Sequence, residues 1–372
     1  MRRLREYFSF SAAGTVPALD SAFQRAAFPY DTYPLNRRVN PIADLCTLIS
    51  LVLLFRRHRP DLIHAFDTKP CVFARLAAKL TGVPVVVGTL PGLGSLYVQT
   101  DLATRVVRTI YERLQKLVCY LSDMTIFQNH DDAQQFVARG LAPVSKITVI
   151  PGSGVRTDLL DPNKISQTEL ERVRAELSIP PDALLITMIA RLIRSKGVAE
   201  FAAAAQMVHH QYPETSFLLV GPADEGSVDR LTPEELSQLP QSIIRTGTRE
   251  DIPVILAASD VFVLPSFYRE GIPRVLLEAA AMGLPLVTTD SPGCKEVVKD
   301  GVNGFLVPVR DPVGLAGAIL RLVKSPEMRQ RFGRESRQYA ETRFDLSVVA
   351  ERTRLLYQEL LSSKGLLVKS EE

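Results

Sequence analysis

Short apolar runs alternate with helix-like segments along most of the chain. In the first half the apolar runs predict strands at EYFSFSA (6–12), YDTYPL (30–35), DLIHAFD (61–67), PVVVGT (84–89), MTIFQN (124–129) and ITVIPG (147–152). Segments with apolar residues at helical spacing lie between them, near 17–27, 41–57, 70–81, 102–121 and 131–139. Strands that alternate regularly with helices favour parallel α/β layers.

A second series of the same kind follows the polar stretch 156–182. Its predicted strands are LLITMIA (184–190), SFLLVG (216–221), SIIRTG (242–247), DVFVLPS (260–266), PLVTTD (285–290) and GFLVP (304–308). Helices are predicted near 197–212, 250–258, 273–282, 294–299, 312–323, 326–342 and 345–363. We therefore expect an α/β fold of two Rossmann-like, doubly wound domains facing a cleft.

The predicted domain bounds are 1–155 and 156–344, followed by 345–372. That last segment is expected to hold a helix that packs back across the hinge, and then a polar tail. Open α/β domains usually begin with a buried strand and a tight Gly-rich turn, whereas residues 1–13 read MRRLREYFSFSAA. We therefore expect the first domain to lack its first strand and helix.

The charge balance differs between the two halves of the chain. Residues 1–160 carry 19 Lys and Arg against 12 Asp and Glu, whereas residues 161–372 carry 25 against 29. A basic first half indicates an anionic partner. A membrane surface is favoured over nucleic acid, because no basic run is interleaved with aromatic residues and Trp is absent.

The overall composition, 46% hydrophobic and 23% charged, is typical of a soluble globular protein. The four cysteines have no metal or redox spacing, which predicts buried thiols in a reducing cytosol. The basic start is followed by no apolar signal region, and the apolar run at 48–55 is too short to span a bilayer. We expect a cytoplasmic protein, either free or peripheral at the inner membrane.

Two acids and two cations stand out in the second half. Glu270 and Glu278 are separated by seven residues in YREGIPRVLLEAAAMG, and the upstream segment ARLIRSKG carries Arg191 and Lys196. Cations and a helix N-terminus suit a diphosphate, and carboxylates suit sugar hydroxyls. The pattern predicts one pocket for a sugar nucleotide at the carboxyl edge of the second sheet.

Each of these residues also has a structural explanation when taken alone. The two cations could lie on a solvated loop, Glu270 could stabilise a helix dipole, and Glu278 could form an internal salt bridge. The function is favoured by their combination with the loop Gly271–Ile272–Pro273. Backbone N–H groups at 291–293 could also hold an anion, although ordinary turn chemistry explains that segment equally well.

The first half offers weaker candidates. Gly92 and Gly94 follow a predicted strand but lack the third glycine of a dinucleotide fingerprint, which favours a loop lining a cleft. His64 and Lys69 lie at another strand end, where a substrate contact and a capped helix start are equally good explanations. Helix 102–121 has a broad apolar face beside a basic flank. It could lie on anionic lipid or be an ordinary surface helix.

Together these segments resemble the retaining glycosyltransferases of the GT-B fold, in the large E-x(7)-E class that includes bacterial polysaccharide and lipopolysaccharide enzymes. The matching segments, in the order of that class, are PDLIHAFDTKP, the Gly-rich loop, FQNHDDAQQFV, VIPGSGV, ARLIRSKG, DVFVLPSFYREGIPRVLLEAAAMGLPLVTTDSPG and DGVNGFLVP. Two departures are Pro91, where many relatives carry His, and Arg156, where many carry Asp.

The resemblance implies a role for each matching residue. Arg191 and Lys196 would stabilise the departing diphosphate, and Glu270 would contact the transferred sugar. The donor would also contact Glu278, the backbone of 271–273, Ser153 and Gly154. The acceptor side would include Gly92, Gly94, His64 and Lys69. The resemblance implies no metal and no other cofactor.

The expected function is therefore transfer of a sugar from a nucleotide sugar, a UDP-sugar by family habit, to a lipid-linked or saccharide acceptor. The anomeric configuration would be retained, and the product would be a surface polysaccharide. Two alternatives stay open at this point: a nucleotide-sugar epimerase on the same fold, and a truncated nucleotide-binding protein without catalysis.

Overall fold

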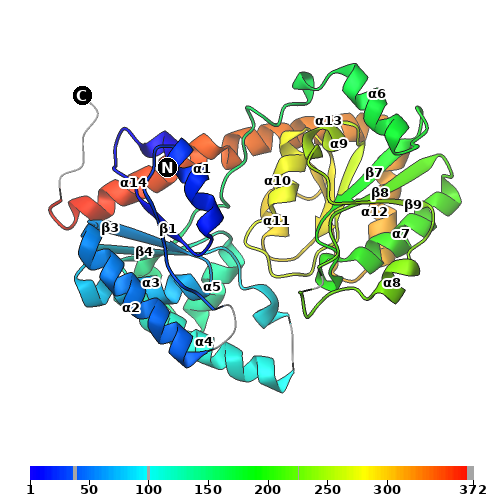
Figure 1. Cartoon of the computed structure of the whole chain (residues 1–372). Coiled ribbons are helices and arrows are strands. Elements are labelled where there is room, and N and C mark those ends of the chain that lie inside the picture. The colour runs from blue at the N-terminus through cyan, green and yellow to red at the C-terminus, as the bar shows by residue number, and fades with distance from the viewer. Residues whose placement is uncertain (37–39, 99–100, 225, 367–372) are drawn as a thin grey trace. The chain divides into compact units, whose positions relative to one another are not determined.

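The structure is a computed structural model that describes residues 1–36, 40–98, 101–224 and 226–366. The chain forms two compact units (Figure 1). Unit 1 comprises Met1–Ile150 together with the chain from Val349 onward, and unit 2 comprises Pro151–Val348. The first unit thus ends before the predicted bound at 155, and the last helix returns to it.

Unit 1 contains two parallel sheets. The strands β3 (Leu62–Phe66), β4 (Val85–Leu90), β5 (Met124–Phe127) and β6 (Ile147–Val149) pair in this order, and β1 (Ala12–Gly14) pairs with β2 (Tyr30–Thr32). Its α-helices are α1 (Asp20–Arg25), α2 (Pro41–His58), α3 (Lys69–Thr81), α4 (Leu102–Leu121), α5 (His130–Ala138) and most of α14 (Leu346–Ser362). Every residue of β4 is buried, which explains why its sequence is apolar apart from Thr89.

Unit 2 contains one parallel sheet in the order β12-β11-β10-β7-β8-β9. The strands are β7 (Leu184–Ile189), β8 (Thr215–Val220), β9 (Ile243–Gly247), β10 (Val261–Leu264), β11 (Leu286–Thr289) and β12 (Gly304–Val307). The helices are α6 (Gln167–Glu176), α7 (Val198–Gln211), α8 (Pro233–Ser237), α9 (Ile252–Ala257), α10 (Arg274–Ala281), α11 (Cys294–Val297), α12 (Pro312–Lys324) and α13 (Pro326–Tyr339).

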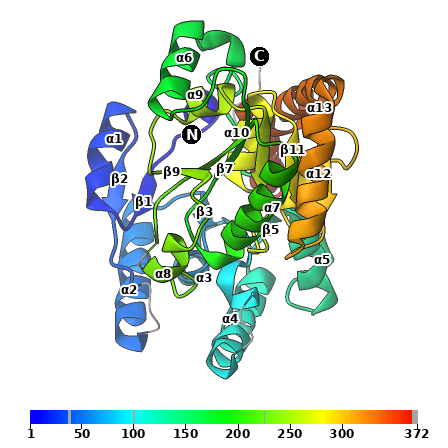
Figure 2. The ribbon, with the colours of Figure 1, turned by 90° about the vertical axis from the view of Figure 1, so that its right-hand side faces the viewer.

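Helices cover both faces of this sheet (Figure 2). Ile186 and Phe217 belong to the apolar core on the side of α7 and α12, whereas Leu185 and Leu218 belong to the core on the side of α6 and α9. Alternate residues of one strand therefore face two different cores, as expected for a doubly wound sheet.

Two predictions about the fold need correction, and two helices were missed. Residues 6–11 form no strand, because Phe8 packs against Tyr357 of α14, with ring centroids 5.7 Å apart, instead of pairing in a sheet. Helices α6 and α8 were not predicted, because both are short and polar. Cys46 is exposed, since it lies on the outer side of α2, whereas the other three cysteines are buried.

No helix within the described residues is both long and apolar enough to cross a membrane.

Candidate functional site

The strand order of unit 2 reverses between β7 and β10. From β7 the sheet runs through β8 to β9 on one side and through β10 to β12 on the other. In open α/β sheets, ligands bind beyond the carboxyl ends of the strands at such a reversal. The loop after β7 carries Arg191 and Lys196, and the loop after β10 carries Glu270. The sequence-predicted residues therefore lie at the point where this topology places a ligand.

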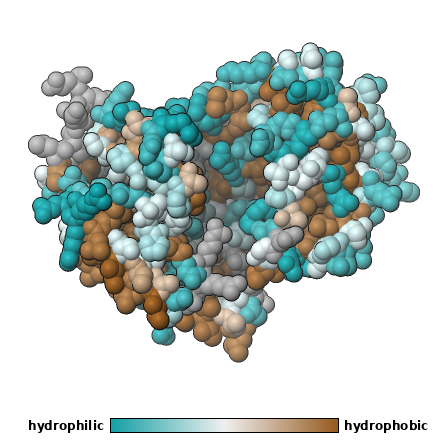
Figure 3. Space-filling model, viewed as in Figure 1, coloured by the Kyte–Doolittle hydropathy of each residue, from teal (hydrophilic) through white to brown (hydrophobic). Residues whose placement is uncertain are grey.

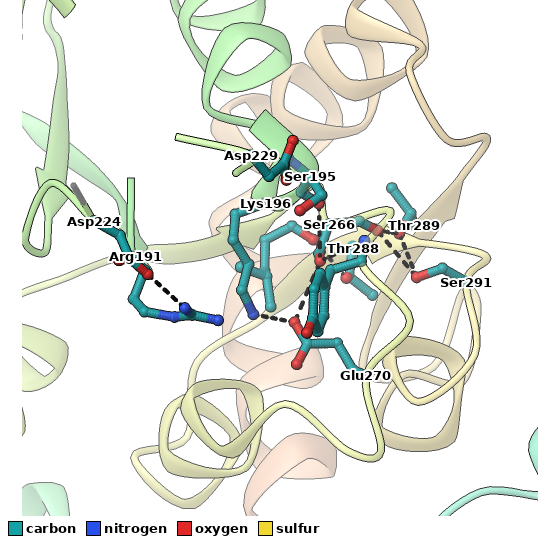
Figure 4. A network of polar contacts seen from close by, with 12 residues as sticks. Arg191, Ser195, Lys196, Asp224, Asp229, Ser266, Glu270, Thr288, Thr289 and Ser291 are labelled. Carbon is teal, nitrogen blue, oxygen red and sulfur yellow. Dashed lines mark hydrogen bonds and ion pairs between the residues drawn. The ribbon is translucent and has the colours of Figure 1, made fainter. Parts of the chain in front are cut away.

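Lys196 and Glu270 form a direct ion pair at this point (Figure 4). Their side chains are only 12% and 13% exposed. The Lys196 ammonium also lies 5.4 Å from the centre of the Tyr268 ring, and the Ser266 hydroxyl donates to Glu270 Oε1 over 3.3 Å. Two charges withdrawn from water in this way act strongly on any charged group placed beside them.

Backbone contacts hold the two loops together. The carbonyl of Ser195 accepts the N–H groups of Phe267 at 2.8 Å and Tyr268 at 2.9 Å. The N–H of Ser195 donates to Asp229 Oδ2 at 2.9 Å, which fixes the first loop to the segment after β8. The positions of Lys196 and Glu270 are therefore coupled through the residue that precedes Lys196.

The loop after β11 supports the other side of Glu270. The hydroxyls of Thr289 and Ser291 both donate to the carbonyl of Ser266, the latter over 3.0 Å. Gly293 has φ +80°, and a Cβ there would lie 2.8 Å from the carbonyl oxygen of Glu270. The segment 291–293, which the sequence suggested as an anion site, thus supports the loop that carries Glu270. Ser291 does so through its hydroxyl, and Gly293 does so through its close backbone contact.

Arg191 and Glu278 have partners of their own. Arg191, half exposed, donates to Asp224 over 2.6 Å, and its guanidinium points toward the Lys196–Glu270 pair in Figure 4. Glu278 accepts from Arg274, one turn earlier in α10, over 2.9 Å. The structure therefore brings together Lys196 and Glu270, with Arg191 on the same edge. Glu278 has the internal salt bridge that the sequence also allowed.

The remaining predicted donor residues surround the start of α10. Gly271, Ile272 and Pro273 are buried just before its first residue. A Cβ on Gly152 would lie 3.6 Å from Ile272, so the segment with Ser153 and Gly154 runs beside this helix start. The first N–H groups of a helix have no partner within the helix, which leaves them available to an anion.

The four predicted acceptor-side residues lie in unit 1. His64 and Lys69 line a cavity of about 540 Å³ between β1, α2 and β3. The ring nitrogens of His64 bond to the Tyr357 and Thr89 hydroxyls, and Lys69 pairs with Asp44 over 2.5 Å. Gly92 (φ +146°) and Gly94 (φ +62°) follow β4 and are outside the described lining of this cavity.

The enclosure of His64 has a consequence for acid stability. Burial, and to a smaller degree the Arg75 guanidinium, lowers the pKa of His64 from 6.5 to about 3. The folded chain keeps the ring neutral, whereas the unfolded chain takes up a proton below pH ~6.5. The neutral His64 ring therefore makes its full contribution to the free energy of unfolding above pH ~6.5, and this contribution is lost as the pH falls toward 3.

Between about pH 7 and pH 5 we expect the free energy of unfolding to fall by about 1–2 kcal/mol more in the native chain than in His64→Gln. Urea unfolding at a series of pH values measures the difference. If the free energy of unfolding changes equally with pH in the two proteins, the pKa of His64 is not lowered in the folded chain.

Sequence reasoning missed several residues that support this site. Asp224 and Asp229 lie in the loop after β8, and no local pattern marks them as partners of the loop after β7. Gly293 lies in the segment 291–293 that the sequence offered for an anion, but the close backbone contacts at Gly197 and Gly293 were not predicted, although a glycine directly before a helix at a strand end often allows them. Among the described residues, no group of three or more His, Cys, Asp or Glu side chains is placed to hold a metal ion.

Comparison with known proteins agrees with this geometry. Residues 183–325 match the family described as "Glycosyl transferases group 1", and residues 10–152 match the "Glycosyl transferase 4-like domain". The chain is 30% identical over 291 residues to an Escherichia coli protein named UDP-Gal:alpha-D-GlcNAc-diphosphoundecaprenol alpha-1,3-galactosyltransferase. That match covers 77% of this chain and 73% of the relative.

Two further similarities cover most of the chain. The N,N'-diacetylbacillosaminyl-diphospho-undecaprenol alpha-1,3-N-acetylgalactosaminyltransferase of Campylobacter jejuni is 29% identical, over 87% of this chain and 84% of the relative. The crystal structure of Anabaena HepE in complex with UDP superimposes with a TM-score of 0.79 at 20% identity, over 96% of this chain and 94% of the other. The chain belongs to the glycosyltransferases of group 1 and has their GT-B fold.

Proposed function

We propose that this chain transfers a sugar from a UDP-sugar to a lipid-linked or saccharide acceptor in the assembly of a surface polysaccharide. The observation that carries the proposal is the Lys196–Glu270 pair at the strand reversal between β7 and β10. A cation and an acid held in one place can meet the two parts of a nucleotide sugar, its diphosphate and its sugar hydroxyls.

The charge distribution fits the chemistry of sugar transfer. When the bond between the anomeric carbon and the diphosphate oxygen breaks, negative charge develops on the leaving diphosphate. Lys196 and Arg191 would neutralise that charge, and the start of α10 would add its partial positive charge. Glu270 would hold a hydroxyl of the sugar while the acceptor hydroxyl forms the new bond and passes its proton to the leaving diphosphate.

Attack on the face that the diphosphate leaves would retain the anomeric configuration. We also propose that transfer needs no metal, since fixed cations can do the electrostatic work that a divalent ion does in other enzymes. The largely buried position of Lys196 supports this, because a charge shielded from water needs no rearrangement as the bond breaks.

Relatives support the choice of substrates. The Escherichia coli relative is named for UDP-galactose and a diphosphoundecaprenol acceptor, and the Campylobacter jejuni relative is named for a diphospho-undecaprenol acceptor as well. HepE, which shares the fold, was crystallised with UDP. A lipid-linked acceptor would place the enzyme at the cytoplasmic face of a bacterial membrane.

Glu278 tests the donor part of this proposal. Its carboxylate would hold the ribose hydroxyls of the donor, and loss of such a charged hydrogen bond typically costs about 1.5–3 kcal/mol. We therefore expect Glu278→Gln to weaken UDP binding about ten- to a hundredfold in calorimetric titration, with an unchanged circular dichroism spectrum.

Arg274→Gln is the matched control, because it removes the partner of Glu278 while leaving the carboxylate in place. Arg274 is 82% exposed, and exposed helix pairs contribute only about 0.2–0.5 kcal/mol. Its UDP affinity should stay within about twofold of the native value. Unchanged binding in Glu278→Gln, or equal losses in both variants, would remove Glu278 from the donor site.

Transfer itself is measured with labelled UDP-sugars, with and without membrane lipid from a polysaccharide-producing bacterium. Label that enters the lipid fraction only when lipid is added supports the proposal. An altered sugar without any acceptor would indicate the epimerase alternative.

A further inference from the structure

Gly221 brings the end of β8 against the end of β7. Its φ is +142°, and a Cβ there would lie 2.8 Å from the carbonyl carbon of Ala190 and closer still to its oxygen. Only glycine fits at this position without a shift of the backbone. Ala190 directly precedes Arg191, so this close approach fixes the backbone from which the Arg191 side chain begins.

The loops after β7 and β8 continue side by side from this point. The carbonyl of Pro222 accepts the N–H of Leu192 over 2.9 Å, and Leu192 also forms a parallel bridge with Ala223. Asp224 directly follows this bridge on one loop, and Arg191 directly precedes it on the other. The backbone bonds therefore hold the aspartate and the arginine next to each other.

The two side chains meet through a hydrogen bond that uses one end of the arginine. The Asp224 carboxylate accepts from Nη1 of Arg191 over 2.6 Å. A guanidinium carries five N–H donors, so this bond leaves others for a second acceptor. In Figure 4 Asp224 meets one end of the guanidinium, and the other end points toward Lys196 and Glu270. That end faces the place where the diphosphate of a UDP-sugar would lie.

Stability alone does not account for this pair. The Arg191 side chain is 50% exposed and that of Asp224 is 25% exposed, and ion pairs at such exposure contribute little to folding. Hydrophilic residues are widespread over the visible face of unit 2, so this surface does not need one more charged pair for its hydration (Figure 3). The pair does restrict Arg191, since a half-exposed arginine otherwise samples many rotamers.

We propose that Asp224 is a positioning residue for sugar transfer. It holds the guanidinium of Arg191 toward Lys196 before the UDP-sugar binds, so that binding does not have to order that side chain. Ordering one flexible side chain weakens binding by about three- to tenfold. The inference rests on the proposed function, which assigns Arg191 to the diphosphate, and it adds a residue that touches neither the sugar nor the diphosphate.

The negative charge of Asp224 acts in the opposite direction. A carboxylate beside Arg191 repels a diphosphate, although water and salt screen this repulsion at a half-exposed site. If repulsion outweighed orientation, removal of the carboxylate would tighten the binding of UDP. The two effects therefore predict changes of opposite sign in a single variant, Asp224→Ala.

Transfer assays at varied concentrations of labelled UDP-sugar measure that change. We expect Asp224→Ala to raise the KM for the UDP-sugar about three- to tenfold while kcat stays within about twofold. The reason is that the bound diphosphate orders Arg191 in place of Asp224. Glu341→Ala is the matched control, because it removes the acid of another ion pair of unit 2, with Arg337 at 2.6 Å, outside the loops of the site. Its KM and kcat should equal those of the native chain.

The same change in Arg191→Gln shows whether Asp224 acts through the arginine. Arg191→Gln with Asp224→Ala should have the KM of Arg191→Gln alone, within about twofold. The proposal is overturned if Asp224→Ala raises KM equally in both backgrounds, or if it lowers kcat instead. It is also overturned if Asp224→Ala leaves KM unchanged or lowers it.

Calorimetric titration with UDP separates this proposal from the proposed function. The dissociation constants for UDP should follow the pattern of the KM values, whether or not sugar is transferred. Weaker UDP binding in Asp224→Ala, in a chain that transfers no sugar, would remove the proposed function and keep Asp224 as the residue that orients Arg191. Transfer by the native chain with an unchanged KM in Asp224→Ala would do the reverse.

Discussion

Replacing Lys196 by methionine is expected to lower the rate of sugar transfer by about a hundred- to a thousandfold. The ammonium lies beside Glu270 with only 12% of the Lys196 side chain exposed, so its charge is poorly screened by water. Methionine keeps most of the volume of the side chain and removes the charge. The loss should therefore fall on kcat, measured with a saturating labelled UDP-sugar.

Arg194→Gln is the matched control for Lys196→Met. Arg194 lies in the same turn, but it pairs with Glu235 and is 42% exposed. Such exposed pairs contribute only about 0–1 kcal/mol, and Arg194 lies away from the Lys196–Glu270 pair, so the rate should change by less than about threefold.

A double variant separates catalysis from folding. Lys196→Met leaves Glu270 without its cation, which costs stability because Glu270 is only 13% exposed. Lys196→Met with Glu270→Gln should recover that stability without recovering transfer. Recovery of the rate in the double variant would show that neither charge takes part in transfer, and that Lys196→Met lowers the rate only by destabilising the site.

The sequence predicted the strands of unit 2 well because each has a buried apolar run and ends at a polar loop. The same pattern led to the error at residues 6–12. Alternating aromatic residues fit a half-buried strand, but here Phe8 meets Tyr357, which lies near the other end of the chain. No local pattern can distinguish a sheet partner from a distant helix.

The chemistry of the site was predictable, but its support was not. Lys196 and Glu270 were predicted to meet because parallel strands carry their following loops to one edge. Asp229, which fixes the N–H of Ser195, lies 34 positions away with no distinguishing motif. The pairing of Glu278 with Arg274 is visible in the sequence as an i, i+4 pair, which is why both of its explanations stayed open.

The missed helices had recognisable beginnings. Ser166 and Glu169 form a capping box at the start of α6, and Thr232 and Glu235 form one at the start of α8. A serine or threonine followed three positions later by glutamate predicts a helix start even where the apolar pattern is weak.

Gly197→Ala is expected to destabilise unit 2 by at least about 3 kcal/mol and to disrupt the site. Gly197 has φ +80°, and a Cβ there would lie 2.7 Å from the carbonyl carbon of Pro265 and closer still to its oxygen. The backbone cannot yield without moving Pro265, which directly precedes the loop that carries Glu270. Urea unfolding followed by circular dichroism measures the loss.

The loss in Gly197→Ala has two causes, the left-handed backbone and the contact with Pro265, and Gly301→Ala separates them. Gly301 also lies in unit 2 with a positive φ of +72°, but nothing lies within 4 Å of the position of its Cβ. Gly301→Ala should therefore lower the free energy of unfolding by only ~1–2 kcal/mol, the cost of placing alanine in the left-handed conformation, and should leave transfer unaffected. If Gly197→Ala costs no more than Gly301→Ala, the close approach of Pro265 does not hold the Glu270 loop in place. The coupling between the loops must then come from the Lys196–Glu270 ion pair and from the Ser195 carbonyl, which accepts from the N–H groups of Phe267 and Tyr268.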